Sequence, residues 1–417
     1  MKSLRLFSVL LFYCYTSLSL GQNSIPQIAS GKIDLRQWDF AKQGEVKLDG
    51  SWNFHWKKLL SPHQLKSVRS KDYMQFPAVW NGQSSLYEKL EGQGYATYTS
   101  SVFINSSIPL LSLELPDFYS SYRVWVNGKE VASNGIVGTS RKESEAQWKP
   151  QTVVFSVSSD TLHLVMQVSN FQHHKGGCND HIYLGAADQL FQKREKAVTT
   201  NVILFGGLSL IGFFFVILYF FFRHEKAALY FAAICITWAI RSVFNNLYLS
   251  ISWFPNFDWE LGAKIEYLTL YLTMMWSILF VAKLFPEDIN RKVKYTMLIL
   301  NAVFILLTLA TPAFTYSTLL PAYMVVAWMI LAYVAYVVIM ALIYERKGAW
   351  FSAISIFLGI IMFSYDMLTH SDLFDFNPLL FNIGYMTIFL LNATAFAYQL
   401  SQAMKPKEKP EFEWSLK

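Results

Sequence analysis

The densest group of chemically versatile side chains is a nine-residue stretch, His173-His174-Lys175-Gly176-Gly177-Cys178-Asn179-Asp180-His181. Imidazoles, thiols and carboxylates are the side chains that bind zinc. The spacing here matches no standard Cys/His site, however, and two adjacent glycines are typical of a loop that joins two strands. We therefore predict no metal, and we interpret the stretch as a ligand-contacting loop in which His173 and His174 are the candidate contacts.

A second group combines aromatic rings with one guanidinium: Trp80, Tyr122, Arg123 and Trp125. Sugars bind by placing the apolar faces of their rings on aromatic side chains, while a few polar groups fix their hydroxyls. These four residues are therefore candidate ligand contacts. Packing in a hydrophobic core is the alternative, and the usual burial of aromatic side chains favours it for any single one of them.

Three ionisable residues, Arg241, Glu266 and Asp366, lie inside hydrophobic stretches of the second half of the chain. At 1.5 Å per residue, all three fall within ~15 Å of the same membrane surface. Charged groups in a bilayer are costly and usually face the interior of a helical bundle. We predict a cluster that couples the helices; isolated structural pairs, or side chains that reach toward the interface, are the alternative.

No arrangement of residues indicates catalysis. The chain contains no Gly-Lys-Ser/Thr phosphate loop and no Gly-x-Ser-x-Gly elbow. We expect a protein that is not an enzyme and needs no cofactor. The net charge of +6 does not indicate a nucleic-acid partner, because much of the basic excess lies in short loops between hydrophobic stretches.

The elements that must position these residues fall into two halves. The stretch 201–222 contains 22 residues without a charge, enough to span the ~30 Å hydrocarbon core of a bilayer. A composition of 53% hydrophobic and 15% charged residues is typical of a multi-pass membrane protein. Six more hydrophobic stretches follow, at 228–249, 262–284, 294–312, 319–343, 350–369 and 379–400.

Lysine and arginine in the loops predict the orientation of these seven spans. The loops 250–259, 313–318 and 370–378 contain neither residue, which assigns them to the exported side. Lys193, Arg194 and Lys196 are an exception, because they flank the first span on that same side. The loops predicted to be cytoplasmic contain Arg223, Lys226, Arg291, Lys292, Lys294, Arg346 and Lys347, and Lys405, Lys407 and Lys409 follow the last span.

Residues 1–21 have the features of a secretory signal. Lys2 and Arg5 precede a short apolar core, and the small residues Ser19 and Gly21 precede a plausible cleavage site before Gln22. An uncleaved first helix is the alternative, but ten apolar residues are too few to span a bilayer comfortably.

Residues 22–192 show the pattern of short β-strands separated by turns. Apolar and polar residues alternate over 48–54 and 95–103, and strand-like segments occur at 153–157 and 162–168. The segment 122–126 leads into Asn127-Gly128, the strongest short signal for a hairpin. With no helical period between the strands, this half is predicted to be an antiparallel β-sandwich.

Several of these segments, in this order, resemble a known family. Asp34–Trp38, Val46–Phe54, Phe76–Trp80, Gly94–Tyr98, Trp125–Gly128 and Gln167–Phe171 are similar to the jelly-roll ectodomain of bacterial seven-transmembrane receptors with diverse intracellular signalling modules. The Gly-x-Trp-x-Phe and Val-Asn-Gly features also resemble the galactose-binding-like, non-catalytic domain of some glycoside hydrolases. The resemblance implies a receptor whose ligand is often taken to be a carbohydrate.

The end of the sequence differs from the pattern of this family. The resemblance implies a kinase, cyclase or phosphatase module after the seventh helix, whereas residues 405–417 are polar and contain proline. We therefore expect either a separate cytoplasmic signalling protein as the output partner or a truncated gene.

We predict four segments: a signal peptide (1–21), a periplasmic β-sandwich sensor domain (22–192), a seven-transmembrane helical domain (193–404) and a short cytoplasmic tail (405–417). The expected location is the bacterial inner membrane, and the expected ligand is a small molecule, with a saccharide as the candidate. A transporter or channel with an accessory carbohydrate-binding ectodomain is the alternative, and a membrane-tethered hydrolase is a third hypothesis. Whether the protein forms a homodimer stays open.

Overall fold

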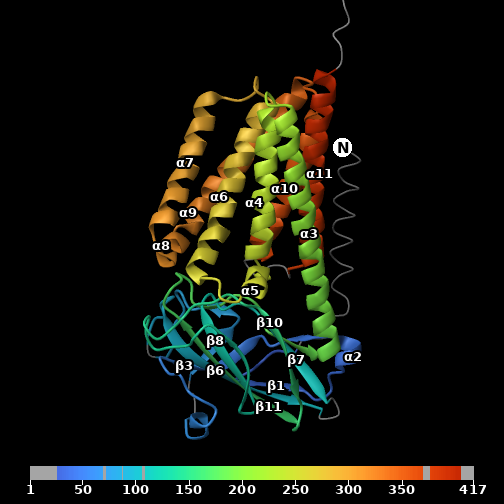
Figure 1. The fold of residues 1–417 in the computed structure, drawn as a ribbon. Coiled ribbons are helices and arrows are strands. Elements are labelled where there is room, and N and C mark those ends of the chain that lie inside the picture. Colours follow the sequence, from blue (N-terminus) through green and yellow to red (C-terminus); the bar gives the residue numbers. More distant parts are fainter. Residues whose placement is uncertain (1–25, 69–71, 87, 106–108, 370–375, 405–417) are drawn as a thin grey trace, which may run out of the picture.

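A computed structural model describes residues 26–68, 72–86, 88–105, 109–369 and 376–404. The predicted signal peptide and cytoplasmic tail lie outside these residues. A β-sandwich lies at one end of a bundle of long helices, and the chain passes from one to the other only once (Figure 1). The predicted fold class, a β-sandwich followed by a seven-helix membrane bundle, is confirmed.

The larger sheet of the sandwich has seven strands in the order β4-β3-β6-β11-β8-β9, with β1 paired in parallel to one end of β6. Its centre is formed by the two longest strands, β6 and β11, which pair along ten residues. The strands are β1 (Lys32–Leu35), β3 (Gly50–Trp56), β4 (Asp72–Phe76), β6 (Gly94–Ile104), β8 (Ser121–Val126), β9 (Lys129–Asn134) and β11 (Thr161–Asn170).

The smaller sheet has four strands in the order β10-β7-β13-β2, and one hydrophobic core fills the space between the two sheets. Trp52 and Phe54 of β3 meet Leu113 of β7 and Leu184 of β13 in this core. The remaining strands are β2 (Val46–Lys47), β5 (Ala78–Val79), β7 (Leu110–Leu115), β10 (Gln151–Ser156), β12 (Gly177–Cys178) and β13 (Tyr183–Ala186), with β5 and β12 forming a separate pair.

The predicted hairpin at Asn127-Gly128 joins β8 to β9. Asn127 has φ = 50° and Gly128 has φ = 82°, so both central residues adopt the left-handed conformation that a two-residue hairpin turn of this kind requires. This hairpin fixes the register of β8, and that register decides which side chains of β8 face the core and which face outward.

Among the described residues, seven helices are long and apolar enough to cross a membrane, as predicted, and two short helices lie near the sandwich (Figure 1). The seven are α3 (Ala187–Phe221), α4 (Lys226–Phe244), α6 (Trp259–Leu284), α7 (Arg291–Ala310), α9 (Leu320–Ile343), α10 (Ala349–Thr369) and α11 (Pro378–Ala403); the short ones are α5 (Leu249–Trp253) and α8 (Ala313–Thr318). The sandwich itself contains the short helix α2 (Phe40–Gln43).

Helix α3 begins directly after β13, with no loop between Ala186 and Ala187. It therefore extends fourteen residues farther toward the sandwich than the apolar stretch 201–222 predicted. This extension carries Lys193, whose Nζ lies 2.7 Å from Glu45 and 2.8 Å from Glu114 of the sandwich. The pairing gives a physical reason for one of the three basic residues that precede the first span on the sandwich side, because the charge of Lys193 is balanced by two carboxylates.

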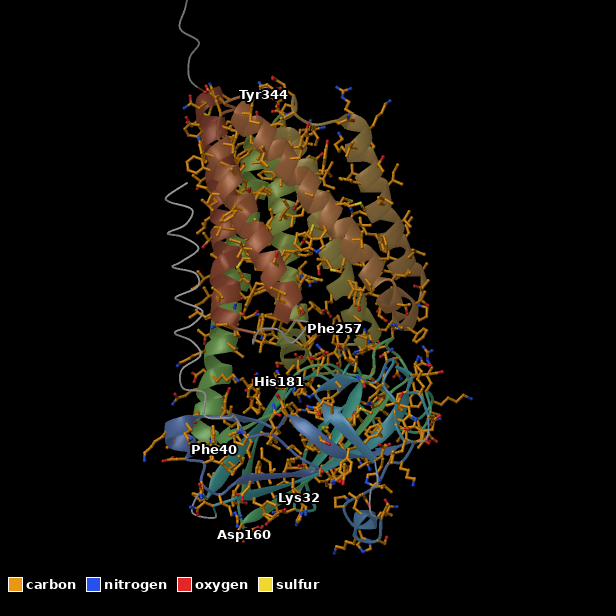
Figure 2. All side chains as sticks on the ribbon, turned by 180° about the vertical axis from the view of Figure 1, so that it is seen from behind. Lys32, Phe40, Asp160, His181, Phe257 and Tyr344 are labelled. Carbon is orange, nitrogen blue, oxygen red and sulfur yellow. The ribbon has the colours of Figure 1, made fainter. Side chains whose placement is uncertain are left out.

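The loops of the bundle alternate between its two ends. Phe257, in the loop before α6, lies beside the sandwich, whereas Tyr344, after α9, lies at the opposite end (Figure 2). The short helices α5 and α8 lie at the sandwich end (Figure 1). The loops without lysine or arginine at 250–259 and 313–318 are thus on the sandwich side, and Arg346 and Lys347 are on the far side.

Candidate functional site

The structure does not bring the six predicted ligand contacts into one place. Trp80 and Tyr122 lie in the sandwich core, Arg123 and Trp125 lie on the outer face of the seven-stranded sheet, and His173 and His174 lie where the sandwich meets the bundle. Ligand binding by these residues stays a prediction, and each place has a different chemistry.

Trp80 and Tyr122 are fully buried and make polar contacts inside the protein. Trp80 donates its Nε1–H to the Tyr98 hydroxyl over 2.6 Å, and the Tyr122 hydroxyl accepts a hydrogen bond from Gln151 Nε2 over 3.1 Å. A buried aromatic side chain whose polar atom has a partner is what stable core packing requires. These positions favour the core alternative for both residues.

Arg123 and Trp125 share the outer face of the sheet with residues from the five strands β3, β4, β6, β9 and β11. Neither Trp125 nor its partner Val165 belongs to the core between the sheets, because alternate residues of a strand point to opposite faces. We call this surface the sheet face. Strand register arranges it in two rows: Ser133, Arg123, Gln167, Thr97 and His55; and Glu130, Trp125, Val165, Thr99, Asn53 and Tyr73.

The sheet face combines one large ring with many hydrogen-bonding groups. The Arg123 guanidinium lies 5.8 Å from the centre of the Trp125 ring and 3.6 Å from Glu130. Gln167 and His55 are 8% and 7% exposed, so neighbouring residues cover most of their surface. Trp125 is 9% exposed, so a ligand ring can reach it only at its exposed edge, next to polar side chains that can contact hydroxyl groups.

The loop that contains His173 and His174 is held in shape by the buried side chain of Asn170. Asn170 Nδ2 donates to the carbonyl oxygens of Gly92, His173 and Lys175, and Asn170 Oδ1 accepts from the His173 backbone N–H. The segments approach so closely that a Cβ at Gly92 would lie 1.9 Å from the His174 carbonyl oxygen. The two histidines are therefore presented on a rigid loop.

His173 connects the sandwich to the bundle. Its Nε2 lies 3.3 Å from the hydroxyl of Tyr267 in α6, and its ring stacks on Tyr119 with the ring centres 5.0 Å apart. Beside it, the His174 backbone N–H donates to Ser317 Oγ of α8 over 3.1 Å. His173 thus contacts a membrane-spanning helix and His174 contacts the short helix α8, and His173 is 5% exposed.

Trp148 makes the second connection. This residue belongs to a loop of the sandwich, yet its side chain packs in the hydrophobic cluster of the bundle. Its ring centre lies 5.1 Å from that of Tyr248 and 5.2 Å from that of Trp259, and its Nε1–H donates to the Tyr119 carbonyl oxygen over 3.0 Å. We call this set of contacts the junction. It comprises Tyr119, Trp148, His173 and His174 on the sandwich side, and Tyr248, Trp259, Tyr267 and Ser317 on the bundle side.

Burial changes the protonation of two groups at the junction. It lowers the pKa of His173 to about 4, although a hydrogen bond to the Lys175 carbonyl acts in the opposite direction. Burial, together with the nearby carboxylates of Asp180 and Glu266, raises the pKa of Asp117 to about 8. At pH 7 His173 is therefore neutral, and Asp117, whose pKa lies above 7, is mostly protonated.

The three predicted intramembrane residues lie at the sandwich end of the bundle. Arg241 Nη1 donates to the backbone carbonyl of Glu266 over 2.8 Å, which joins α4 to α6. The Arg241 guanidinium lies 5.8 Å from the Trp238 ring, whose centre lies 4.3 Å from that of Tyr385. Coupling between the three charges stays a prediction.

The members of the His/Cys stretch have different partners. Cys178 is buried, with its Sγ 3.2 Å from the Asp180 carbonyl oxygen, and His181 Nδ1 lies 2.8 Å from Asp49. Within the described part of the chain, no three His, Cys, Asp or Glu side chains are grouped as they would be around a metal ion.

Sequence reasoning missed most of the junction. Tyr119, Trp148, Tyr248 and Trp259 are aromatic residues in loops or at a helix start, and no periodicity or motif marks them. The one available signal was Trp148 itself, a large aromatic ring in a polar loop where neither strand nor helix would bury it.

These features define a class of protein: a β-sandwich continuous with the first of seven membrane-spanning helices. Residues 198–402 match the model of the family described as 7TM diverse intracellular signalling. The match covers the seven helices almost from end to end, so the membrane domain of this chain is similar to that family. The resemblance predicted from the sequence is confirmed. Comparison with curated proteins gives no match.

Solved structures similar to the chain come from glycoside hydrolases. They include a GH2 beta-galacturonidase from Eisenbergiella tayi bound to galacturonate (17% identity, TM-score 0.24), a beta-glucuronidase from Ruminococcus gnavus (14%, 0.26) and a GH2 member from Bacteroides cellulosilyticus (14%, 0.26). Each similarity covers 34% of this chain and only 24%, 28% and 20% of the respective enzyme. Similarity this short and distant assigns neither activity nor substrate to this protein.

Proposed function

We propose that this protein is a non-enzymatic membrane receptor that senses a small extracytoplasmic molecule through its sandwich and relays the signal through its seven helices. In this proposal the chain resides in a bacterial inner membrane, with the sandwich in the periplasm. The absence of lysine and arginine from the loops 250–259 and 313–318 at the sandwich end supports this orientation.

The observation that carries the proposal is the junction. A domain that merely accompanies a membrane protein needs no more than a linker, whereas here Trp148 of the sandwich packs in the core of the bundle and His173 reaches Tyr267 of α6. Helix α3 adds a third connection, because it continues β13 without a loop. A shift of the sandwich would move at least α3, α6 and α8, which is what a relay requires.

The proposed ligand is a saccharide, and the proposed binding surface is the sheet face. Arg123, Trp125 and Gln167 supply a guanidinium, a ring and an amide within two rows of one sheet. The bound galacturonate in one of the similar structures is a ligand of that glycoside hydrolase and is no evidence for this chain. The proposal for this chain rests on the side chains of the sheet face.

The proposed output is a separate cytoplasmic signalling protein that reads the far end of the bundle. Two polar contacts tie the helix ends there: Arg346 pairs with Asp288 over 3.1 Å, and Gln399 donates to the Lys347 carbonyl over 2.8 Å. These contacts join the ends of α6, α9 and α11, so a displacement of α6 at the junction has a route to this end.

Thermal unfolding of the full-length protein in nanodiscs, against a panel of soluble glycans, tests the ligand. A saccharide at 100 times its Kd should raise the stability by about 2.7 kcal/mol. The double variant Arg123→Ala/Trp125→Ala should lose this response, and Arg141→Ala, which removes an exposed loop arginine elsewhere in the sandwich, should keep it. A folded protein that responds to no glycan, or a response that survives the double variant, would contradict the proposed ligand or its surface.

A further inference from the structure

A small crevice lies between α3, α4 and α11, near the end of the bundle that faces the sandwich. It encloses about 10 Å³, which is the space of a single water molecule. Six of the eight residues that line it are polar, four of them in membrane helices (Asn201, Arg241, Ser242 and Asn382) and two directly after α4 (Asn245 and Asn246); the other two are Trp238 and Phe381.

The polar walls are buried. Asn201, Ser242, Asn245 and Asn382 are between 6% and 8% exposed. Polar side chains within a membrane bundle are costly, and they usually mark a pathway or a binding site for a polar molecule. Four amides and a hydroxyl around one arginine are far more than packing between three apolar helices requires.

Arg241 has unused hydrogen-bonding capacity. A guanidinium has five N–H donors, and among the described residues Arg241 makes one hydrogen bond, to the Glu266 carbonyl, and no ion pair. A guanidinium in a membrane bundle normally pairs with an anion or with several carbonyls. The remaining N–H groups of Arg241 can therefore donate hydrogen bonds to an acceptor that is not one of the described residues.

Asn201 provides an independent observation. Its Oδ1 is buried and has no hydrogen-bond partner among the described residues, although the side chain lines the crevice. Rotation of the amide by 180° would present the NH₂ group at the same point. The backbone beside the crevice is also strained, because Asn246 and Tyr248 have φ values of 58° and 45°.

We propose that the crevice binds a small monovalent anion, either a halide or a single carboxylate group, between Arg241 and the amides of Asn201 and Asn382. The N–H donors of the lining favour negative charge, and a space the size of one water molecule admits only a halide or the oxygen end of a small carboxylate such as formate. Glu266 and Asp366 at the same end of the bundle oppose an anion, so the expected affinity is millimolar. The bound anion would link α3, α4 and α11, which makes it a regulator of how these helices pack; this inference does not depend on a saccharide ligand.

The test compares thermal unfolding of the full-length protein in nanodiscs at constant ionic strength, with sodium chloride, sodium formate or sodium gluconate. Gluconate is too large for the crevice and supplies the reference. At a concentration of about 100 times the Kd, chloride or formate should raise the unfolding midpoint by roughly 5 °C. A response to chloride alone identifies a halide site, and a response to formate identifies a carboxylate site.

Variants distinguish this site from a general salt effect. Arg241→Gln and Asn382→Ala should abolish or weaken the response, and Lys292→Gln, at the exposed start of α7, should keep it in full. If Arg241→Gln does not fold, Asn201→Ala provides the same comparison without removal of a charge. Equal midpoints in all three salts, or a shift that persists unchanged in the crevice variants, would show that the crevice holds only water and would overturn the proposal.

Discussion

Acidification should open the junction through one side chain, His173. This ring is 5% exposed and lies between Tyr119 of the sandwich and Tyr267 of α6. Burial holds its pKa at about 4, below its ordinary value of 6.5. A histidine with a lowered folded-state pKa contributes stability that is complete above pH 6.5 and is lost as the pH falls from 6.5 to 4, because the exposed ring takes up a proton that the buried ring refuses.

The two pKa values set the size of the effect. At about 1.36 kcal/mol per pKa unit, the difference between 6.5 and about 4 corresponds to a total of about 3 kcal/mol. Most of this, about 2 kcal/mol, should be lost between pH 7 and pH 4.5. The titratable groups that act on the ring are Lys175 and His174, and carboxylates elsewhere in the protein also titrate in this range, so a matched variant is needed.

The assay is thermal unfolding of the full-length protein in nanodiscs from pH 7.5 to 4.5, for wild type and His173→Phe. The phenylalanine keeps the stack on Tyr119 but cannot take up a proton. The stability difference between the two proteins should change by about 2 kcal/mol across this range, in favour of the variant at low pH. His63→Phe, at an exposed position in the sandwich, should run parallel to wild type. Parallel curves for wild type and His173→Phe would refute the reasoning.

Three further predictions concern the junction and the membrane. Trp148→Ala removes a ring packed against Tyr248 and Trp259, and should cost about 3–5 kcal/mol of junction stability. In this variant, spin labels at Asp160→Cys and Leu309→Cys should report a broader distribution of distances between the sandwich and α7 than in wild type. The control variant Trp350→Ala, at an exposed site on α10, should leave the distribution narrow. Asp117→Asn should stabilise the protein by an amount that grows as the pH rises from 4 to 8 and is complete above pH 8, because the raised pKa of Asp117 means that its charged form is the destabilising one. Unfolding midpoints at pH 4 and pH 9 check the sign. Reporter fusions after Lys226, Lys294 and Lys347 should indicate cytoplasm and a fusion after Phe257 should indicate periplasm; two inverted reporters would rule out the seven-span topology.

Local patterns predicted most of the fold. The seven helices follow from hydrophobic length alone, and the β8–β9 hairpin follows from Asn127-Gly128, because both signals reside in neighbouring residues. The start of α3 was predicted fourteen residues late, because its first turns are polar and pair with the sandwich rather than with lipid. Lys193 illustrates this, since its partners Glu45 and Glu114 are distant in sequence.

The candidate sites were less accessible to sequence reasoning, for a physical reason. Whether an aromatic side chain points into a core or outward depends on strand register, and register separates Tyr122 from Arg123 and Trp125 although the three are almost adjacent. His173 was selected for its chemistry, yet its place at the junction depends on Tyr267, about ninety residues away. Counting residues along each span predicted that Arg241 and Glu266 lie at the same depth in the membrane. Only the structure shows that Arg241 contacts the backbone of Glu266.

The central claim is that events in the sandwich reach the far end of the bundle through the junction. The most direct measurement attaches an environment-sensitive fluorophore at Tyr344→Cys, at the end opposite the sandwich (Figure 2), in the full-length protein in nanodiscs, and titrates the glycan panel. The account predicts that a glycan that stabilises the sandwich changes the fluorescence, and that Trp148→Ala/His173→Ala abolishes this change while the thermal stabilisation of the sandwich persists. A glycan that stabilises wild type without any change at residue 344, or a change that survives the double variant, would contradict it.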